Sequence, residues 1–314
     1  MKIVITDGYT LNPGDLHWTQ FEKDAQVEYY DRTQPVETVA RTFGADIIIT
    51  NKTIIDADVI HAASHLKMIA VTATGYNNVD VEAANRKNVV VCNVPGYGTQ
   101  SVAQHSFALL LELTNSVGNN ATSVSKGEWS AAKDWCYSMQ PIVEISGKTI
   151  GIIGMGKIGK QVAAIANAFG MQVIYNGGKA SEPYCKQVSL YDLFMQSDFI
   201  SLHCPLTAAN AAFVNKELLG LMKPTAYLIN TARGALINEK DLGQVLHQRK
   251  IAGAALDVLS TEPPSKANPL IGLSNCIITP HNAWISKEAR QRIMDITLQN
   301  IKAFIKAKPQ NVVS

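Results

Sequence analysis

Three polar residues in the second half of the chain have side chains suited to holding a carboxylate or carbonyl group and to moving a proton. Arg233, Glu262 and His281 follow one another at intervals of 29 and 19 residues. An imidazole exchanges protons near neutral pH, a carboxylate beside its second ring nitrogen would select the tautomer, and a guanidinium can bind a carboxylate or polarise a carbonyl. Each residue alone is more often structural or part of a surface ion pair. Their joint order favours a catalytic set.

A glycine-rich segment, Gly154-Met-Gly156-Lys-Ile-Gly159, has the pattern G-x-G-x-x-G. It lies between an expected strand at 149–153 and an expected helix at 160–169, the context in which this pattern binds dinucleotides. Gly154 would allow the tight turn, Gly156 the approach of a pyrophosphate, and Gly159 the close packing of helix and strand. The N–H groups at the helix start would then face the phosphates. Without that context the glycines could form an ordinary turn.

The choice between NAD and NADP depends on the end of the next expected strand, 172–175. An acid about 20 residues after the glycine motif commonly holds the ribose hydroxyls. Here the strand is followed by Asn176, Gly177, Gly178 and Lys179. Asn176 can bind a ribose but would not repel a 2′-phosphate, and Lys179 could attract one or be an ordinary solvated lysine. NAD is the first expectation, with NADP as the alternative.

The elements that must position these residues are visible as short apolar runs, each followed by a turn and then by helical spacing. Most runs are continuous rather than alternating, as in parallel strands covered on both faces, and their alternation with helices predicts βαβ units. Ligands bind beyond the carboxyl ends of such strands, which is where Arg233, Glu262, His281 and also Asp257 are expected. The expected strands are 2–6, 46–50, 68–72, 89–92, 149–153, 172–175, 199–202, 226–230, 252–256 and 276–279.

Two long helical patterns, at 101–117 and 287–305, indicate how the chain is divided. The simplest topology places residues 1–98 and 286–314 in a flavodoxin-like substrate domain. Residues 99–285 would then form a Rossmann dinucleotide-binding domain inserted into it. The predicted fold class is therefore α/β, with two doubly wound parallel-sheet domains.

The composition is that of an ordinary globular chain of 314 residues. Lys and Arg number 28 against 26 Asp and Glu, a net charge of +2, which gives no electrostatic reason to expect nucleic acid or an anionic membrane as a partner. Five well-separated cysteines argue against a disulfide framework or a metal site. No apolar stretch reaches the roughly 20 residues of a membrane span, and no signal peptide is visible. We expect a cytoplasmic protein.

The order Arg233, Glu262, His281, together with the glycine motif, resembles the D-isomer-specific 2-hydroxyacid dehydrogenase family over essentially the whole chain. Within the family, residues 73–80 (Ala-Thr-Gly-Tyr-Asn-Asn-Val-Asp) and 95–105 most resemble the glycerate dehydrogenase, or hydroxypyruvate reductase, branch. The resemblance implies an enzyme that reduces a small 2-keto acid to its D-2-hydroxy acid with NAD(P)H. Hydroxypyruvate and D-glycerate are the favoured pair, while glyoxylate and other small keto acids stay open.

In that reaction, hydride transfer to the keto carbon leaves an alkoxide that must be protonated as it forms. His281 would be the general acid, Glu262 would orient its ring, and Arg233 would hold the carboxylate or keto oxygen. The loop of Thr74 and Gly75 resembles the one whose N–H groups receive the substrate carboxylate. The further positions that resemble cofactor contacts are Lys157, Ile158, Cys204, Pro205, Thr231, Ala232 and Asp257, the last toward the nicotinamide carboxamide.

The resemblance also implies a homodimer, formed through the helix 101–117. The segment 118–148 is irregular and aromatic in composition, which suits a connecting or subunit-contact role, and Trp135 could reach a neighbouring site. Two other histidines receive no chemical role: His203 is expected to position backbone, and His105 is expected to be structural.

A second class of function is a dinucleotide-sensing binding protein, like the transcriptional corepressors built on the same fold. Such proteins keep the cofactor motif and often the polar triad, so the motifs alone do not separate the two classes. The lack of disordered tails or a peptide-recruiting extension disfavours this alternative. Oxidation of NADH in the presence of hydroxypyruvate discriminates between them.

Overall fold

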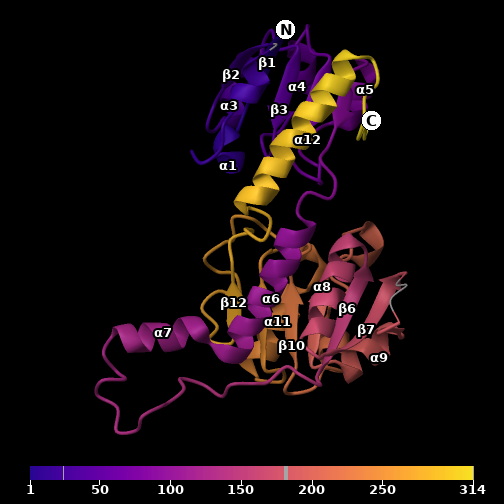
Figure 1. Cartoon of the computed structure of the whole chain (residues 1–314). Helices are drawn as coiled ribbons and strands as arrows, with labels where there is room; N and C mark the ends of the chain where they lie inside the picture. The colour runs from indigo at the N-terminus through magenta and orange to yellow at the C-terminus, as the bar shows by residue number, and fades with distance from the viewer. Residues whose placement is uncertain (24, 180–182, 314) are drawn as a thin grey trace. The chain divides into compact units, whose positions relative to one another are not determined.

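The computed structural model of the chain consists of two compact units. Unit 1 comprises Met1–Gly98 and Ile285–Ser314, and unit 2 comprises Thr99–Trp284. Each unit contains one sheet of parallel strands with helices packed on it (Figure 1). The predicted fold class, α/β with two doubly wound parallel sheets, is confirmed. The structure describes residues 1–23, 25–179 and 183–313.

Unit 1 is built on a five-stranded sheet in the order β2-β1-β3-β4-β5, with all neighbours parallel. This is the flavodoxin-like order, which reverses between β1 and β3. β3 and β4 are buried along their whole length, as continuous apolar runs require. The strands are β1 (Lys2–Ile5), β2 (Gln26–Tyr29), β3 (Ile47–Thr50), β4 (Met68–Val71) and β5 (Val90–Cys92). The helices are α1 (Gly8–Leu11), α2 (Thr19–Glu22), α3 (Pro35–Thr42), α4 (Ala57–Ala62), α5 (Val81–Arg86) and α12 (Lys287–Ile305).

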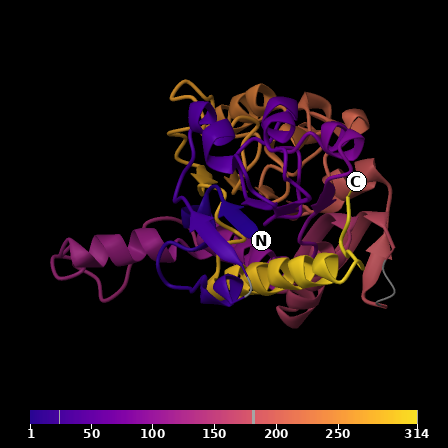
Figure 2. The same cartoon turned by 90° about the horizontal axis from the view of Figure 1, so that it is seen from above.

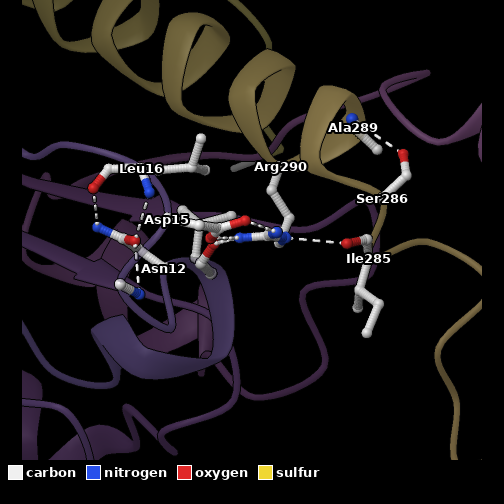
Figure 3. A network of polar contacts seen from close by, with 9 residues as sticks. Asn12, Asp15, Leu16, Ile285, Ser286, Ala289 and Arg290 are labelled. Carbon is white, nitrogen blue, oxygen red and sulfur yellow. Dashed lines mark hydrogen bonds and ion pairs between the residues drawn. The ribbon is translucent and has the colours of Figure 1, made fainter.

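The C-terminal helix α12 packs against β4 with buried residues such as Ile293. Near its start, Arg290 is only 7 % exposed and contacts the carboxylate of Asp15 at 2.6 and 2.7 Å. The same guanidinium donates to the carbonyl oxygen of Leu11 at 3.1 Å. It also donates to the carbonyl oxygen of Ile285 at 2.9 Å, which Figure 3 shows together with the contacts to Asp15. A buried guanidinium needs such a full set of partners, and the set ties α12 to the loop after α1.

Unit 2 is built on a seven-stranded sheet in the order β12-β11-β10-β9-β6-β7-β8, again with all neighbours parallel. This is the Rossmann order with one extra edge strand, β12, and its switch point lies between β6 and β9. The strands are β6 (Thr149–Met155), β7 (Gln172–Gly178), β8 (Cys185–Gln187), β9 (Phe199–Leu202), β10 (Tyr227–Asn230), β11 (Gly253–Leu256) and β12 (Cys276–Ile278). The helices are α6 (Thr99–Asn115), α7 (Val117–Ser125), α8 (Lys157–Ala168), α9 (Leu190–Gln196), α10 (Lys216–Leu219) and α11 (Glu239–His247), with short 3₁₀ turns at Ala208–Asn210 and Gly234–Leu236.

Several elements differ from the expectations. β2 and β8 were not predicted, because these edge strands carry polar and charged residues instead of a continuous apolar run. α8 begins at Lys157, directly at the glycine motif, rather than at Lys160. The segment 118–148 is not irregular throughout, because α7 occupies its first part. The buried side of α7 consists of Ser123, so the apolar periodicity that reveals a helix is missing.

α7 and the loop that follows it extend away from the rest of unit 2, as two views at right angles show (Figures 1 and 2). We call residues 117–142 the arm. Its large apolar side chains are exposed, with Trp135 at 86 %, Val117 at 62 % and Ile142 at 61 %. Several large exposed apolar side chains on one segment are typical of a contact site for another protein.

Within the described residues, no helix combines the length and the apolar character needed to cross a membrane. In the same part of the chain, no three His, Cys, Asp or Glu side chains are grouped so that they could hold a metal ion.

Candidate active site

The glycine motif forms the turn between β6 and α8, and its three glycines have different surroundings. Gly154 has a φ of +97°, and a Cβ there would lie 2.6 Å from the backbone nitrogen of Cys204. A Cβ on Gly159 would overlap the carbonyl oxygen of Gly154. Around the Cβ position of Gly156, no atom of the described structure lies within 4 Å apart from those of Gly156 and its two chain neighbours. Gly154 and Gly159 therefore permit close packing, whereas Gly156 borders open space where a ligand can approach the backbone.

The N-terminus of α8 is free to bind an anion. Gly156 is its N-cap residue and provides no side-chain cap. The N–H groups of Lys157 and Ile158 lie in the first turn, so they have no acceptor within the helix. Such N–H groups and the positive end of the helix dipole attract phosphate. Together with the open space at Gly156, they fit the pyrophosphate of a dinucleotide at the switch point of the sheet.

The turn after β9, which contains Cys204 and Pro205, packs against the glycine turn. It is held by the N–H of His203, which donates to the carbonyl oxygen of Ile153 at 2.7 Å. Burial lowers the pKa of His203 to about 4, and its Nε2 lies 2.8 Å from the hydroxyl of Ser201. Burial also raises the pKa of the Cys204 thiol. Both side chains are therefore uncharged near neutral pH, which suits a positioning role.

The turn after β10 presents Arg233. Asn230 is fully buried, and its Oδ1 accepts the N–H of Ala232 at 2.9 Å while its Nδ2 donates to the carbonyl oxygen of Arg233 at 2.8 Å. These two bonds close the turn, as asparagine side chains commonly do. Thr231, inside the turn, places its hydroxyl 2.9 Å from that of Ser106 on α6. The backbone around Arg233 is thereby fixed while its side chain stays exposed.

Asn176 stands at the end of β7, where an acid commonly binds the ribose. Its Nδ2 donates to the carbonyl oxygen of Val188 at 2.9 Å, which ties β7 to the segment after β8. Gly177 follows with a φ of +77°, and Lys179 is exposed. Among the described residues 176–179, this end of β7 therefore provides amide, glycine and ammonium groups but no carboxylate.

Arg233, Glu262 and His281 line one pocket of about 190 Å³ within unit 2. The pocket forms where the segment after β10 packs on the segment after β11. Gly234 makes this approach possible, because a Cβ there would overlap the backbone of Leu259. The Nη1 of Arg233 donates to the preceding carbonyl oxygen at 2.7 Å, so part of the guanidinium is anchored.

Glu262 and His281 form a directly bonded pair in this pocket. Oε2 of Glu262 lies 2.6 Å from Nδ1 of His281, while Oε1 accepts the N–H of Leu259 at 3.0 Å. The carboxylate is thus fixed by backbone on one side and by the ring on the other. It selects the tautomer that carries hydrogen on Nδ1, which leaves Nε2 to exchange a proton with a ligand. Both side chains are about one-third exposed, so a ligand can reach them.

The backbone at His281 is held in an uncommon conformation. Its φ of 52° lies in the left-handed region, which residues other than glycine seldom adopt. The N–H of His281 donates to the main-chain carbonyl of Asp257 at 2.8 Å. The two oxygens of the Asp257 side chain accept the N–H groups of Asn282 and Ala283, each at 2.9 Å. Asp257 therefore binds three successive residues of the loop that carries the imidazole.

The carboxyl group of Asp257 is 1 % exposed. Burial by itself raises its pKa, but hydrogen bonds from His105, Thr279 and the two backbone N–H groups outweigh this effect, so the pKa lies below its ordinary value. With both oxygens bound inside the protein, Asp257 serves as the anchor of the His281 loop. Its contact with a nicotinamide carboxamide stays a prediction.

Comparison with known proteins identifies the family. Residues 107–283 match the family described as "D-isomer specific 2-hydroxyacid dehydrogenase, NAD binding domain". The match covers more than half of the chain and lies within unit 2. The chain belongs to the D-isomer-specific 2-hydroxyacid dehydrogenase family. The resemblance inferred from the motifs is confirmed, and the chain is a dehydrogenase of this family with an NAD-binding domain.

Relatives of this dehydrogenase align along its full length. It is 45 % identical over 321 residues to "Hydroxypyruvate reductase" of Blautia hydrogenotrophica, and the alignment covers 100 % of both chains. It is 42 % identical over 315 residues to "Glycerate dehydrogenase" of Methylorubrum extorquens, with 99 % of this chain and 98 % of the relative covered. A solved structure of an acyclic imino acid reductase (Bsp5) in complex with NADPH and D-Arg is 38 % identical, with 100 % of both chains covered and a TM-score of 0.86.

The expected substrate loop of the dehydrogenase, Thr74 and Gly75, lies in unit 1 directly after the end of β4. The Thr74 hydroxyl donates to the carbonyl oxygen of Val94 at 3.0 Å, and its own carbonyl accepts Nδ2 of Asn93 at 2.8 Å. These bonds fix the turn, and within the described part of the chain they leave the N–H groups of Thr74 and Gly75 unused. Their binding of a substrate carboxylate stays a prediction.

Sequence reasoning gave no role to three residues that shape the site. Asn230 closes the Arg233 turn, and Gly234 allows that turn to touch the next segment. Glu239 accepts the N–H of Ser260 at 2.6 Å and so supports the loop that leads to Glu262. A signal exists for the first two, because asparagine and glycine flank the turn at positions typical of tight turns. The role of Glu239 depends on a contact with a residue 21 positions away and has no local signal.

Proposed function

We propose that this dehydrogenase reduces hydroxypyruvate to D-glycerate with a reduced nicotinamide dinucleotide. The observation that carries the proposal is the pocket in which the Glu262–His281 pair, at 2.6 Å, lies beside Arg233. The names of two full-length relatives, a hydroxypyruvate reductase and a glycerate dehydrogenase, support this substrate. A small pocket lined by one cation and one proton donor also suits a small keto acid.

The proposed mechanism divides binding and proton transfer among the three side chains. When bound, the reduced nicotinamide supplies a hydride to the keto carbon of the substrate. Arg233 binds the substrate carboxylate or keto oxygen through its N–H groups and polarises the carbonyl. Nε2 of His281 donates a proton to the oxygen on which negative charge develops, and Glu262 stabilises the charged ring through Nδ1. In the oxidative direction, neutral His281 accepts the hydroxyl proton.

We propose NADH as the reductant and expect NADPH to be accepted as well. The groups that fit the pyrophosphate, at Gly156 and the start of α8, do not distinguish the two cofactors. Residues 176–179, the described residues at the end of β7, contain no acid that would repel a 2′-phosphate, and Lys179 could attract one. Replacement Asn176→Asp is expected to lower kcat/KM for NADPH several-fold relative to NADH, because a carboxylate binds the ribose diol and repels a phosphate. Steady-state kinetics with both cofactors measures the ratio, and an unchanged ratio would dismiss the position as a determinant.

We also propose that the dehydrogenase forms a homodimer in which the arm contacts a second copy. The exposed apolar side chains of the arm, Trp135 above all, support this assembly, because such surfaces are commonly covered by another chain. Trp135 would then pack against the partner rather than against its own unit.

The test of the proposed function is a steady-state panel of small 2-keto acids followed by NADH oxidation. Hydroxypyruvate is expected to give the highest kcat/KM, with turnover above about 1 per second, an ordinary enzyme rate. Replacement His281→Ala is expected to remove most turnover while NADH binding, measured by fluorescence titration, stays close to that of the unchanged protein. Absence of turnover with every keto acid would favour the sensing protein, and normal turnover in His281→Ala would refute the proton-donor role.

A further inference from the structure

Helix α6 carries three polar side chains that bind the segments around the pocket. Ser101 and His105 are four residues apart and therefore lie on one face of the helix. The Ser101 hydroxyl donates to the carbonyl oxygen of Ala283 at 2.7 Å, and the hydroxyl of Ser106 lies 2.9 Å from that of Thr231. These contacts connect α6 to the His281 loop and to the Arg233 turn.

His105 binds the anchor of the His281 loop. Its Nε2 lies 3.1 Å from Oγ1 of Thr279 and 3.4 Å from Oδ1 of Asp257. The hydroxyl of Thr279 donates to the same Oδ1 at 2.6 Å, so this hydroxyl can only accept from the N–H of His105. The imidazole and the hydroxyl therefore both direct hydrogens toward one buried carboxylate.

The hydrogen bonds that Asp257 accepts hold the backbone conformation of the loop that carries His281. The carboxylate of Asp257 accepts two N–H groups directly after His281, and the main-chain carbonyl of Asp257 accepts the N–H of His281 itself. The φ of 52° at His281 is a left-handed conformation, which a residue other than glycine keeps only where the surroundings hold it. Ala283 is bound from both sides, by Asp257 at its N–H and by Ser101 at its carbonyl.

We infer that His105 is a positioning residue for the proton donor. Through Thr279 and Asp257 it keeps the loop in the conformation that brings the His281 ring to Glu262. The inference rests on the proposed function, because it concerns the same proton transfer. Among the titratable groups of unit 2 in the described structure, His105 is the one whose ring contacts the Asp257 carboxylate. Glu262 and His281, two further titratable groups of this region, contact each other, and Arg233 lines the same pocket.

The contact between His105 and Asp257 should affect how kcat depends on pH. His105 heads the hydrogen-bond donors that lower the pKa of Asp257 against the raising effect of burial. Without this donor, the pKa of Asp257 rises. The carboxyl group then takes up a proton at a higher pH than in the unchanged protein, and a protonated oxygen accepts fewer backbone N–H groups. The fall of kcat on the acid side should therefore move to higher pH.

The experiment compares three replacements on α6. His105→Leu removes the donor at similar volume, and His105→Gln keeps an N–H near the position of Nε2. Gln104→Leu is the matched control, because Gln104 is the exposed neighbour on the same helix. We expect kcat of His105→Leu to fall by about 10- to 100-fold, as for a displaced catalytic group, with its acid limb moved to higher pH. His105→Gln should recover most of kcat and the original profile, and Gln104→Leu should match the unchanged protein.

A second readout does not depend on turnover. The pH titration of the His281 ring, followed by NMR and assigned with His281→Ala, should change in His105→Leu and stay unchanged in Gln104→Leu. If His105→Leu does not fold, His105→Gln is compared with His105→Asn instead. Only the shorter asparagine side chain is then expected to lower kcat. Unchanged kcat, pH profile and His281 titration in the variant without a donor would overturn the inference. A protein that turns over no keto acid but shows the altered titration would overturn the proposed function, and with it the link to proton transfer, while it would still support the positioning of the His281 loop by His105.

Discussion

The position of the His281 side chain depends on hydrogen bonds that other residues make to the backbone around it. Its ring is oriented by Glu262 at 2.6 Å, and the backbone that carries the ring is held at a φ of 52°. That conformation is maintained by Asp257, a buried carboxylate whose ordinary tendency to be protonated on burial is outweighed by its hydrogen bonds. The proposed proton donor is thus supported by residues that need not touch substrate.

His203 leads to a prediction about stability and pH. Its pKa in the folded protein is lowered from 6.5 to about 4 by burial. Between these two pH values the unfolded chain binds more protons than the folded chain, so this group makes the free energy of unfolding rise as the pH increases toward 6.5 and then contributes no further rise. Urea unfolding of the unchanged protein and of His203→Asn, at about pH 5 and about pH 7, measures the effect. The difference in stability between the two pH values should be smaller in the variant, and an equal difference in both proteins would contradict the assignment.

At the scale of elements, two glycines of the turn between β6 and α8 have different surroundings, which the sequence motif alone does not reveal. Gly159 is surrounded by backbone, whereas Gly156 borders open space. The first position is a packing requirement of the fold, and the second is a requirement of the ligand. Alanine replacements at these two positions should therefore have separate effects, one on the free energy of unfolding and the other on NADH binding.

We predict opposite outcomes for Gly156→Ala and Gly159→Ala. Gly156→Ala should leave the free energy of unfolding within about 0.5 kcal/mol but weaken NADH binding by at least about tenfold, because its methyl group occupies the space of the pyrophosphate. Gly159→Ala should lower the free energy of unfolding by about 1 to 3 kcal/mol, because an overpacked turn must shift. Urea unfolding and fluorescence titration with NADH measure both. A destabilised Gly156→Ala protein, or one that binds NADH normally, would be inconsistent with an open phosphate cradle.

At the scale of the whole molecule, the two units differ in how much of their apolar surface is covered by the chain itself. Unit 1 includes the C-terminal helix, which is fixed by the buried Arg290 and its contacts with Asp15. Unit 2 leaves the arm exposed, with apolar side chains that a second chain could cover. The proposed dimer follows from that exposure.

The dimer can be tested by sedimentation. The unchanged chain, of 34.1 kDa, should sediment as a dimer, and the double replacement Trp135→Ser with Ile142→Ser should shift it toward the monomer. Both side chains are exposed, so the replacements should not impair the fold of a single chain. Lys133→Ser, an exposed polar position on the same arm, is the matched control and should remain dimeric. A monomeric unchanged protein at micromolar concentration would contradict the proposal.

Sequence patterns predicted an element best where burial requires apolar residues at regular positions along the chain. Continuous apolar runs predicted the central strands of both sheets, because strands covered on both faces need them. Helix α12 was predicted with its observed bounds, Lys287–Ile305. The same reasoning missed β2 and β8, since edge strands face water and carry polar residues, and it missed α7, which packs almost no apolar side into its own unit.

By itself, the sequence determined the chemical groups at the strand ends and the turn that can hold a dinucleotide, because residue type and local spacing suffice for both. Only the tertiary structure decided which of these groups touch. The bond between Glu262 and His281, the enclosure of Asp257 by the loop it anchors, and the reach of His105 from α6 to that anchor all join residues far apart in the chain. Such contacts are set by how strands and helices pack, and no local pattern of residues encodes the resulting distances.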